Sequence, residues 1–302
     1  MPQEILVIGG TRYFGIHLVE ALLARGERVT LATRGRTPDP FGTRVRRIAV
    51  DRGDATAMQA AFAGARFDLV YDQMCYGPAE AALAARLFAG RVGRYLMTST
   101  LEVYDALHGR VERGYREDDL DLAHEVPNPP TAYGDGKRRA EGVLLAAAGL
   151  PAATLRLAHV LGGPQDFTGR LRLYVERALS GEVLRHAATP GESSFIDVDG
   201  AVTALLWAGG QGFTGPLNIA SPGPLTAPQL LERVARRLGQ PVRLSAVAGP
   251  AAPTVLSPFD YGASHAMDTG RAQALGLELP ALGLDALVDA HAAARVANRE
   301  PA

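Results

Sequence analysis

A tyrosine and a lysine four residues apart form the clearest chemical pair in the chain. Tyr133 and Lys137 are the first and last residues of the stretch YGDGK, which lies within a helix predicted over residues 132–148. Residues four apart lie on the same face of a helix, so the phenol and the ammonium face the same way. A free phenol has a pKa of about 10 and is a poor base at neutral pH, but a nearby ammonium lowers that value. The pair therefore predicts a tyrosine that exchanges a proton with a bound molecule.

A glycine-containing turn near the N-terminus has the features of a phosphate-binding site. Residues 9–15 (GGTRYFG) follow an apolar run and open a helical pattern. The N-terminus of a helix offers free N–H groups and the positive end of its dipole to a diphosphate. Gly9 permits the tight turn and Gly15 permits close packing of the helix on the strand, while Arg12 replaces the middle glycine of the usual pattern. This context predicts a dinucleotide-binding turn; the alternative is an ordinary turn between a strand and a helix.

The residues after the second predicted strand bear on which dinucleotide binds. A carboxylate at the end of this strand would hold the ribose diol of NAD. Thr33 stands there instead, followed by Arg34 and Arg36, and Arg12 can reach the same region from the turn. A guanidinium can bind a 2′-phosphate through two N–H groups. We therefore expect NADP(H) rather than NAD(H); the alternative is that Arg34 and Arg36 are solvated loop charges.

Short apolar runs alternate with helical patterns along the first half of the chain. The predicted strands are residues 5–8, 29–32, 47–50, 67–71, 95–98 and 153–157. The predicted helices are residues 14–25, 55–63, 79–89 and 132–148. The strands lack polar alternation, as expected when helices cover both faces of a sheet. The pattern predicts an α/β fold, a doubly wound parallel sheet (Rossmann fold), as a dinucleotide-binding domain over residues 1–161.

The second half of the chain is less regular. Gly and Pro recur from Gly162 onward. This composition predicts a smaller, loop-rich substrate-binding subdomain over residues 162–302, with segments near 195–220 returning to the Rossmann core. No internal repeat or Ser/Gly-rich linker separates independent domains.

Composition and charge exclude several classes of protein. The net charge of -1 over 302 residues argues against a strongly basic nucleic-acid surface. The single cysteine, Cys75, excludes an internal disulfide and a Cys-rich metal site. Six of the seven histidines show no metal-ligand spacing with acidic partners, and we expect no metal. No apolar run approaches the roughly 18 residues of a membrane span, and the first residues lack a basic leader, so a cytoplasmic location is expected.

Three further stretches complete a pattern that resembles a known family. They are residues 98–104 (TSTLEVY), 133–137 (YGDGK) and 195–199 (FIDVD), which follow the N-terminal turn in this order. Together they resemble the extended short-chain dehydrogenase/reductase family, the NAD(P)-dependent epimerase/dehydratase group, from residue 4 to about residue 282. The opening GGTR is most similar to the atypical branch that includes the chloroplast stem-loop-binding proteins. The resemblance implies an enzyme that transfers hydride with a nicotinamide cofactor.

The resemblance also implies site residues. Thr100 matches the family's Ser/Thr-x-x-Val-Tyr spacing and would donate to the substrate oxygen, which gives a catalytic set of Thr100, Tyr133 and Lys137. Lys137 would also bind the nicotinamide ribose, and Asp51 would lie by the adenine amino group. The predicted cofactor-binding residues are Gly9, Thr11, Arg12, Tyr13, Phe14, Gly15, Arg34, Asp51, Arg52, Gln73, Met74, Tyr133 and Lys137.

Departures from the family's pattern bear on the substrate. Many relatives hold a nucleotide with an arginine where this chain has Ser193, and a serine cannot make a charge-assisted clamp on phosphate, so a nucleotide sugar is disfavoured. Dehydratases carry an Asp-Glu pair where this chain has Leu101-Glu102, which disfavours dehydration. Glu102 and His159 are candidate substrate contacts. The alternatives are that Glu102 bonds a nearby loop and that His159 fills the cleft wall.

These observations favour an NAD(P)-dependent oxidoreductase or epimerase. It would act by hydride transfer at a carbinol/ketone carbon of a sugar-like or small polar substrate. The alternative is a catalytically silent dinucleotide-binding protein with an RNA-binding or regulatory role, which the run Arg44, Arg46 and Arg47 keeps open. The Ala-rich helices at residues 79–89 and 132–148 predict a homodimer, since relatives commonly pair such helices; alternatively, both pack only on their own sheet.

Overall fold

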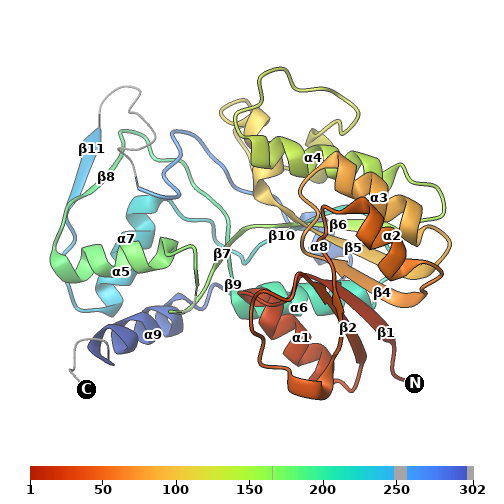
Figure 1. The fold of residues 1–302 in the computed structure, drawn as a ribbon. Helices are drawn as coiled ribbons and strands as arrows, with labels where there is room; N and C mark the ends of the chain where they lie inside the picture. Colours follow the sequence, from red (N-terminus) through yellow and green to blue (C-terminus); the bar gives the residue numbers. More distant parts are fainter. Residues whose placement is uncertain (165, 248–256, 298–302) are drawn as a thin grey trace.

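A seven-stranded parallel sheet forms the centre of the larger part of the molecule (Figure 1). The computed structural model describes residues 1–164, 166–247 and 257–297. The sheet order is β10-β6-β5-β4-β1-β2-β3, and every neighbouring pair is parallel. The strands are β1 (Glu4–Ile8), β2 (Arg28–Thr33), β3 (Arg46–Ala49), β4 (Phe67–Asp72), β5 (Val92–Thr100), β6 (Ala152–Leu157) and β10 (Gly215–Ile219). The predicted doubly wound α/β fold is confirmed.

Alternate residues of the strands enter two separate apolar cores. Leu6 and Ile8 of β1 pack under one layer of helices, while Ile5 and Val7 of the same strand pack under the other. The first layer is α2 (Ala55–Phe62), α3 (Pro78–Phe88) and α4 (Ala132–Leu145); the second is α1 (Phe14–Ala24) and α6 (Val198–Gly209) (Figure 1). This double burial explains why the strands read as continuous apolar runs.

The strand β10 was not predicted from the sequence. It is only five residues long and begins with Gly215 and Pro216, which are both unfavourable in a strand. Proline is tolerated here because β10 pairs on one side only, with β6, at the edge of the sheet. The chain reaches this edge through α6, so the segment from α6 to β10 belongs to the larger part.

The smaller part has an apolar core of its own. Three helices, α5 (Arg170–Ser180), α7 (Ala227–Arg237) and α9 (Leu284–Ala297), enclose it beside a pair of short strands, β8 (Leu184–Ala187) and β11 (Leu244–Val247). The parallel strands β7 (His159–Leu161) and β9 (Phe195–Asp197) run between the two parts, and α8 (Gly270–Ala274) packs on β10 (Figure 1). Three 3₁₀ helices, η1 (Gly42–Arg44), η2 (Leu101–Leu107) and η3 (Glu117–Asp119), complete the described chain. No helix in the described ranges is both long and apolar enough to span a bilayer.

A buried ion pair attaches α4 to the sheet. Arg156 on β6 and Glu141 on α4 are both fully buried, and Nη2 of the arginine donates to Oε2 of the glutamate at 2.7 Å. The hydroxyl of Ser99 on β5 donates to the same carboxylate, and Nη1 of Arg156 donates to the Tyr104 hydroxyl at 2.7 Å. Burial alone would lower the pKa of Arg156, but the adjacent Glu141 raises it above its ordinary value. The network therefore sets the position of α4 against β5 and β6.

Removing one partner of this pair should destabilise the fold. In Glu141→Ala the guanidinium of Arg156 stays buried without a countercharge, so we expect the free energy of unfolding to fall by about 3–5 kcal/mol. The matched control is Glu176→Ala, which breaks an exposed pair with Arg172 on α5 and should change stability by less than about 1 kcal/mol. Urea unfolding measures both, and equal losses in the two variants would contradict the assignment.

Candidate functional site

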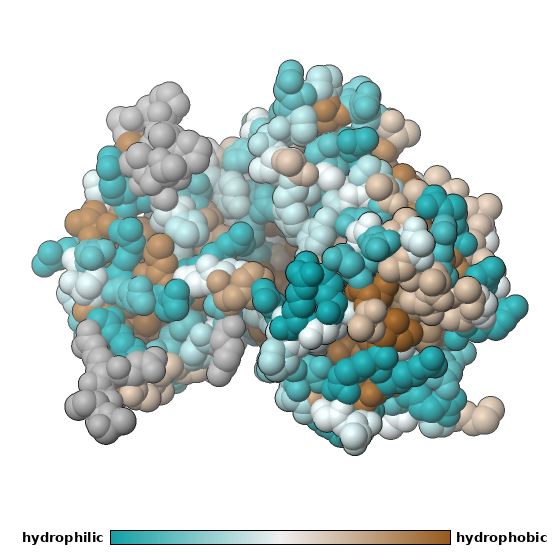
Figure 2. Space-filling view, in the orientation of Figure 1, coloured by the Kyte–Doolittle hydropathy of each residue, from teal (hydrophilic) through white to brown (hydrophobic). Residues whose placement is uncertain are grey.

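A groove of about 570 Å³ follows the carboxyl ends of β1 to β4. Its wall comprises the glycine turn, the loops after β2 and β3, the end of β4, and Phe167 from the smaller part. The space-filling view shows the surface hollowed between the two parts of the molecule (Figure 2). In open α/β sheets, ligands bind in the crevice outside the carboxyl ends of the strands. The groove is therefore where this fold places a ligand.

The glycine turn is shaped by close contact with the end of β4. Gly9 has a φ of +99°, a conformation that L side chains rarely adopt. A Cβ on Gly9 would lie 2.9 Å from Cγ of Met74, and a Cβ on Gly15 would lie 2.5 Å from Oε1 of Gln73. Because α1 begins at Phe14, its N-terminus borders the groove, but the N–H groups of Gly15 and Ile16 already donate to the carbonyls of Arg12 and Tyr13, at 3.0 and 3.1 Å. At Gly9 and Gly10 the groove is bordered by backbone without a side chain, so a diphosphate can approach the turn closely there.

Three arginines border the groove where β2 ends. Arg12, Arg34 and Arg36 are exposed, and none forms an ion pair or a side-chain hydrogen bond with another residue that the structure describes. Thr33, which ends β2, accepts a hydrogen bond from the Gly35 N–H at 3.2 Å. Asp51, after β3, lines the same groove. The groove therefore offers unpaired guanidinium groups at the position where a carboxylate would select an unphosphorylated ribose.

Arg52 also lines the groove, but its side chain is engaged inside the protein. It is 6% exposed and donates two hydrogen bonds to Oδ2 of Asp72, at 2.8 and 3.1 Å. A third bond reaches the Glu80 carbonyl at 2.9 Å. Burial opposes the guanidinium charge, but the Asp72 carboxylate raises the pKa of Arg52 above its ordinary value. Arg52 thus braces the ends of β3 and β4 under the groove.

The predicted catalytic residues come together at the ends of β5 and α4. Thr100 is the last residue of β5, and Tyr133 lies in the first turn of α4, where the Thr131 hydroxyl caps the helix by accepting from the Gly134 N–H at 2.9 Å. The nearby Thr100 hydroxyl lowers the pKa of the Tyr133 phenol, but burial outweighs this effect and raises the pKa of Tyr133 to about 12. Half of the Tyr133 side chain is exposed, so a ligand can reach it.

Lys137 is buried one helical turn from Tyr133. Its ammonium donates to the Thr98 carbonyl at 2.8 Å and lies 4.4 Å from the centre of the Tyr76 ring. Burial lowers the pKa of Lys137 to about 8. The effect expected from the sequence, an ammonium that lowers the pKa of Tyr133, is not seen, because the ammonium contacts Thr98 and Tyr76 instead. Tyr76 lines the groove on its other side, so it separates Lys137 from the groove.

A polar cluster lies beyond Thr100, towards the smaller part. Glu102 and His159, the two candidate substrate contacts, meet here with Oε1 and Nδ1 3.7 Å apart. The Tyr261 hydroxyl lies 3.0 Å from Nε2 of His159, and Nε2 of His265 lies 3.6 Å from Oε2 of Glu102. Burial lowers the pKa of His159 to about 3. Asp105 completes the cluster, 3.8 Å from His265.

Ser193 faces the interior. It is fully buried, its N–H donates to the Leu225 carbonyl at 2.8 Å, and its hydroxyl donates to the His265 carbonyl at 3.3 Å. These contacts leave it no role in holding a phosphate.

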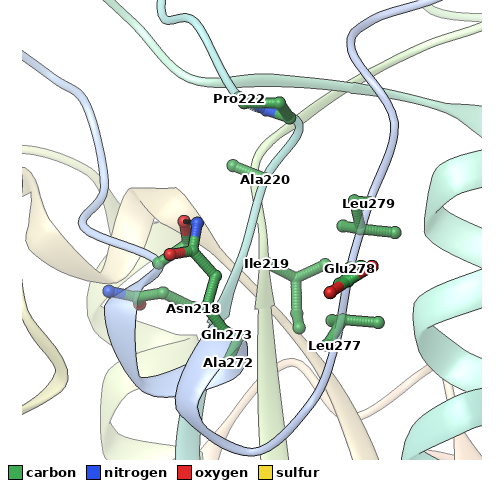
Figure 3. A pocket seen from close by; sticks show the side chains of 10 residues that line it. Asn218, Ile219, Ala220, Pro222, Ala272, Gln273, Leu277, Glu278 and Leu279 are labelled. Atoms are coloured by element: carbon green, nitrogen blue, oxygen red, sulfur yellow. Dashed lines mark hydrogen bonds between the residues drawn. The ribbon is translucent and has the colours of Figure 1, made fainter.

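A second hollow, of about 420 Å³, lies at the carboxyl end of β10 (Figure 3). Ile219 and Leu277 line it, together with Asn218 and Gln273. The Asn218 amide is committed to the carbonyls of Tyr115 and Asp268, at 2.8 and 3.0 Å. The hollow holds no acid–base pair comparable to that of the first site.

Several known proteins are similar to this chain in sequence or in fold. The NAD dependent epimerase/dehydratase family model matches residues 5–81. A 3-diazoavenalumate denitrifying reductase from a Streptomyces species is 30% identical over 299 residues, which cover 93% of this chain and 95% of that protein. The chain belongs to the NAD dependent epimerase/dehydratase family. A 2′-dehydrokanamycin reductase from Streptomyces kanamyceticus is 28% identical over 80% of this chain and 69% of that protein.

Solved structures agree with the fold of this family member. The UDP-glucose 4-epimerase of Thermus thermophilus, solved with NAD, is 23% identical and covers 96% of this chain and 99% of that one, with a TM-score of 0.71. The chloroplast stem-loop binding protein of 41 kDa b from Arabidopsis thaliana is 31% identical, but over only 23% of this chain and 22% of that protein. The likeness to the stem-loop branch is therefore confined to a short segment.

This epimerase/dehydratase family member is an NAD(P)-dependent enzyme of the short-chain dehydrogenase/reductase type. The groove fits such a cofactor, because a Cβ at Gly9 or Gly15 would collide with neighbouring atoms and the N-terminus of α1 borders the same space. Several residues of the site are not predicted by the sequence. They are Tyr76, Glu80 and Phe167 at the groove and Asp105, Tyr261 and His265 in the polar cluster. Of these residues, only Tyr76 could have been found from its position, because it follows the fourth predicted strand at the edge of the sheet where ligands bind.

The buried charge of Lys137 should reduce the stability of the cofactor-free protein. At pH 7 the ammonium is buried at an energetic cost, so we expect Lys137→Met to raise the free energy of unfolding by about 1–3 kcal/mol. The folded pKa of about 8 lies below the ordinary value, so the folded lysine loses its proton first as the pH rises. Wild-type stability should therefore rise from pH 8 towards the unfolded pKa of about 10.4, and the gain of the variant should shrink.

Chemical unfolding at a series of pH values measures this gain. Arg139→Met, an exposed position on the same helix, is the control and should show no such trend. A Met variant that is less stable than wild type at pH 7 would contradict the prediction.

Proposed function

We propose that this enzyme transfers hydride between NADP(H) and a carbinol/ketone carbon of a sugar-like or small polar substrate. The observation that carries the proposal is the placement of Tyr133, at the start of α4, and Thr100, at the end of β5, beside a dinucleotide groove and one helical turn from Lys137. Two relatives are named as reductases, one for a dehydro compound and the other for a diazo compound, which supports reduction as the direction of hydride transfer.

In the proposed reaction the chain handles the proton and the bound cofactor handles the hydride. Tyr133 gives its phenolic proton to the substrate oxygen during reduction and takes it back during oxidation. The Thr100 hydroxyl donates a hydrogen bond to the same oxygen and polarises the carbonyl. Lys137 holds the cofactor ribose, and its charge favours the phenolate that remains on Tyr133 once the ammonium has left the Tyr76 ring. The Tyr76 ring lies over Lys137, so it has to yield for the ammonium to meet the ribose.

NADP(H) is the proposed form of the cofactor. Arg12, Arg34 and Arg36 border the groove without a described ion-pair partner, and Thr33 stands where a carboxylate would repel a 2′-phosphate. A phosphate offers these guanidinium groups charge-assisted hydrogen bonds.

We also propose that two copies pair through α3 and α4. These helices pack side by side on one face of the sheet (Figure 1). Small residues such as Ala79, Ala82 and Ala85 lie on the accessible side of α3, which permits close helix packing. A sedimentation mass near one chain at micromolar concentration would refute the pairing.

The RNA-binding alternative has less support. Arg44 is paired with Glu20 at 2.8 Å, and Arg47 is paired with Asp39 at 2.5 Å. Two of the three arginines of the basic run are thus neutralised within the protein, which weakens their attraction for a phosphate backbone.

Replacing the phenol tests the proposed function directly. Tyr133→Phe keeps the ring but removes the proton donor, so we expect turnover to fall by about 10²–10⁴-fold. The affinity for NADPH should be unchanged, because the phenol does not line the groove. NADPH oxidation with a panel of polar ketones measures turnover, and fluorescence titration measures cofactor binding. Tyr174→Phe, in the core of the smaller part, is the control; full activity in Tyr133→Phe would refute the assignment.

Replacing one arginine tests the choice of cofactor. In Arg34→Ala the 2′-phosphate loses a charge-assisted contact, so we expect the Kd of NADPH to rise by about 10–100-fold while that of NADH stays nearly constant. Arg46→Ala removes an exposed arginine of β3 outside the groove and should leave both constants unchanged. The proposal of NADP(H) fails if Arg34→Ala and Arg12→Ala both keep the wild-type ratio of the two constants.

A further inference from the structure

The polar cluster contains a set of hydrogen-bond acceptors with no cationic partner from Lys or Arg. Nε2 of His265 lies 3.6 Å from Oε2 of Glu102 and 3.8 Å from Oδ1 of Asp105. The three ligand atoms all lie within 4.8 Å of one another. In the described part of the chain, only imidazoles lie within ion-pair distance of these two carboxylates. The set is next to the catalytic residues, because Glu102 follows Thr100 by two positions and its charge acts on Tyr133.

His265 is the second observation that points to a ligand. Its side chain is fully buried, yet neither ring nitrogen has a hydrogen-bond partner among the described residues. Leaving buried polar atoms unpaired destabilises a protein by roughly 1–3 kcal/mol each. The nitrogen Nε2 faces both carboxylates. A ligand atom placed between the three groups would give a partner to Nε2 of His265 and to both carboxyl groups at once.

The protonation of the two carboxyl groups shows what kind of ligand fits. Burial would raise the pKa of Glu102, but the adjacent His265, Asp105 and His159 hold it well below its ordinary value. Burial and the adjacent Glu102 raise the pKa of Asp105 to about 8. At neutral pH one of the two groups is therefore ionised and the other keeps its proton. A bound cation would allow both to ionise.

We propose that Glu102, Asp105 and His265 bind a protonated amine of the substrate. An ammonium has three N–H donors and no acceptor, so it matches three converging acceptors. The Tyr261 ring stacks on His265 with centroids 4.4 Å apart and adds an aromatic face beside the cation. This inference rests on the proposed function, because it takes the cluster to face the substrate.

The surrounding charged groups agree with a cation at this place. The Asp105 carboxylate accepts from the Thr131 hydroxyl, which leaves its other oxygen facing His265. His108 stacks on His265 with centroids 5.5 Å apart, and burial lowers the pKa of His108. The charge of Arg170 acts on the surrounding His159, Tyr133 and Tyr261, and among the described residues Arg170 forms no ion pair with either carboxyl group of the set.

A metal ion is the competing occupant. A histidine that binds a metal nearly always donates its other N–H to a carboxylate, a carbonyl or water. Nδ1 of His265 has no such partner among the described residues. The set therefore lacks a feature that accompanies histidine at most metal sites.

Binding of two matched sugars tests the inference. Glucosamine carries an ammonium, and N-acetylglucosamine replaces it with a neutral amide on the same ring. We expect the NADPH-bound protein, titrated in a calorimeter below pH 7, to bind glucosamine at least about tenfold more tightly. Glu102→Gln should abolish this preference and Asp105→Asn should reduce it, while Glu112→Gln, an exposed control, should keep it. Unchanged NADPH affinity shows that each variant is folded.

Equal affinity for the two sugars, or no binding of either, would overturn the inference. One-to-one binding of Zn²⁺ that is lost in both Glu102→Gln and His265→Asn would overturn it in favour of a metal. The preference is measured without turnover, so its result is separate from that of Tyr133→Phe, on which the proposed function depends.

Discussion

The buried pair of Arg156 and Glu141 is the interaction on which the site depends. It joins α4 to β6, and the Ser99 hydroxyl extends it to β5. Thr100 follows Ser99 directly on β5, while Tyr133 and Lys137 lie on the same helix as Glu141. The buried ion pair therefore fixes the position of Thr100 on β5 relative to Tyr133 and Lys137 on α4. A buried pair of this kind contributes less to net stability than to geometry, because the cost of desolvation offsets much of the attraction.

The other buried ionisable groups near the site differ in how well they are paired. Arg52 is paired with Asp72 under the groove. By contrast, Lys137 has only a carbonyl and an aromatic ring, and burial lowers its pKa to about 8. Asp105 keeps a proton beside Glu102. Strongly shifted pKa values gather where a ligand is to be bound, because the ligand supplies the missing partner. The fold thus accepts local instability in exchange for reactive groups.

The sequence predicts those features that are encoded locally. Six strands of the sheet follow from apolar runs, and the dinucleotide turn follows from Gly9 and Gly15 between a strand and a helix. The edge strand β10 escapes prediction because its Gly215 and Pro216 are acceptable only at an edge, which is a property of the whole sheet. The meeting of His265 with Glu102 and Asp105 also escapes it, because long-range folding alone brings these segments together. The same holds for Tyr76, whose contact with Lys137 depends on the packing of the β4 loop against α4.

The glycine turn and the substrate side of the site are mechanically connected. Tyr13, in the turn, has a φ of +54°, which is unusual for a residue with a side chain. Its hydroxyl donates to the Val160 carbonyl at 2.7 Å, and burial raises its pKa above the ordinary value. Val160 follows His159 on β7, the strand that leads from the sheet to the smaller part. A strained backbone persists only where its surroundings determine it. The bond to Val160 is such a determinant, so the turn that receives the cofactor and the strand that carries His159 are held in one arrangement.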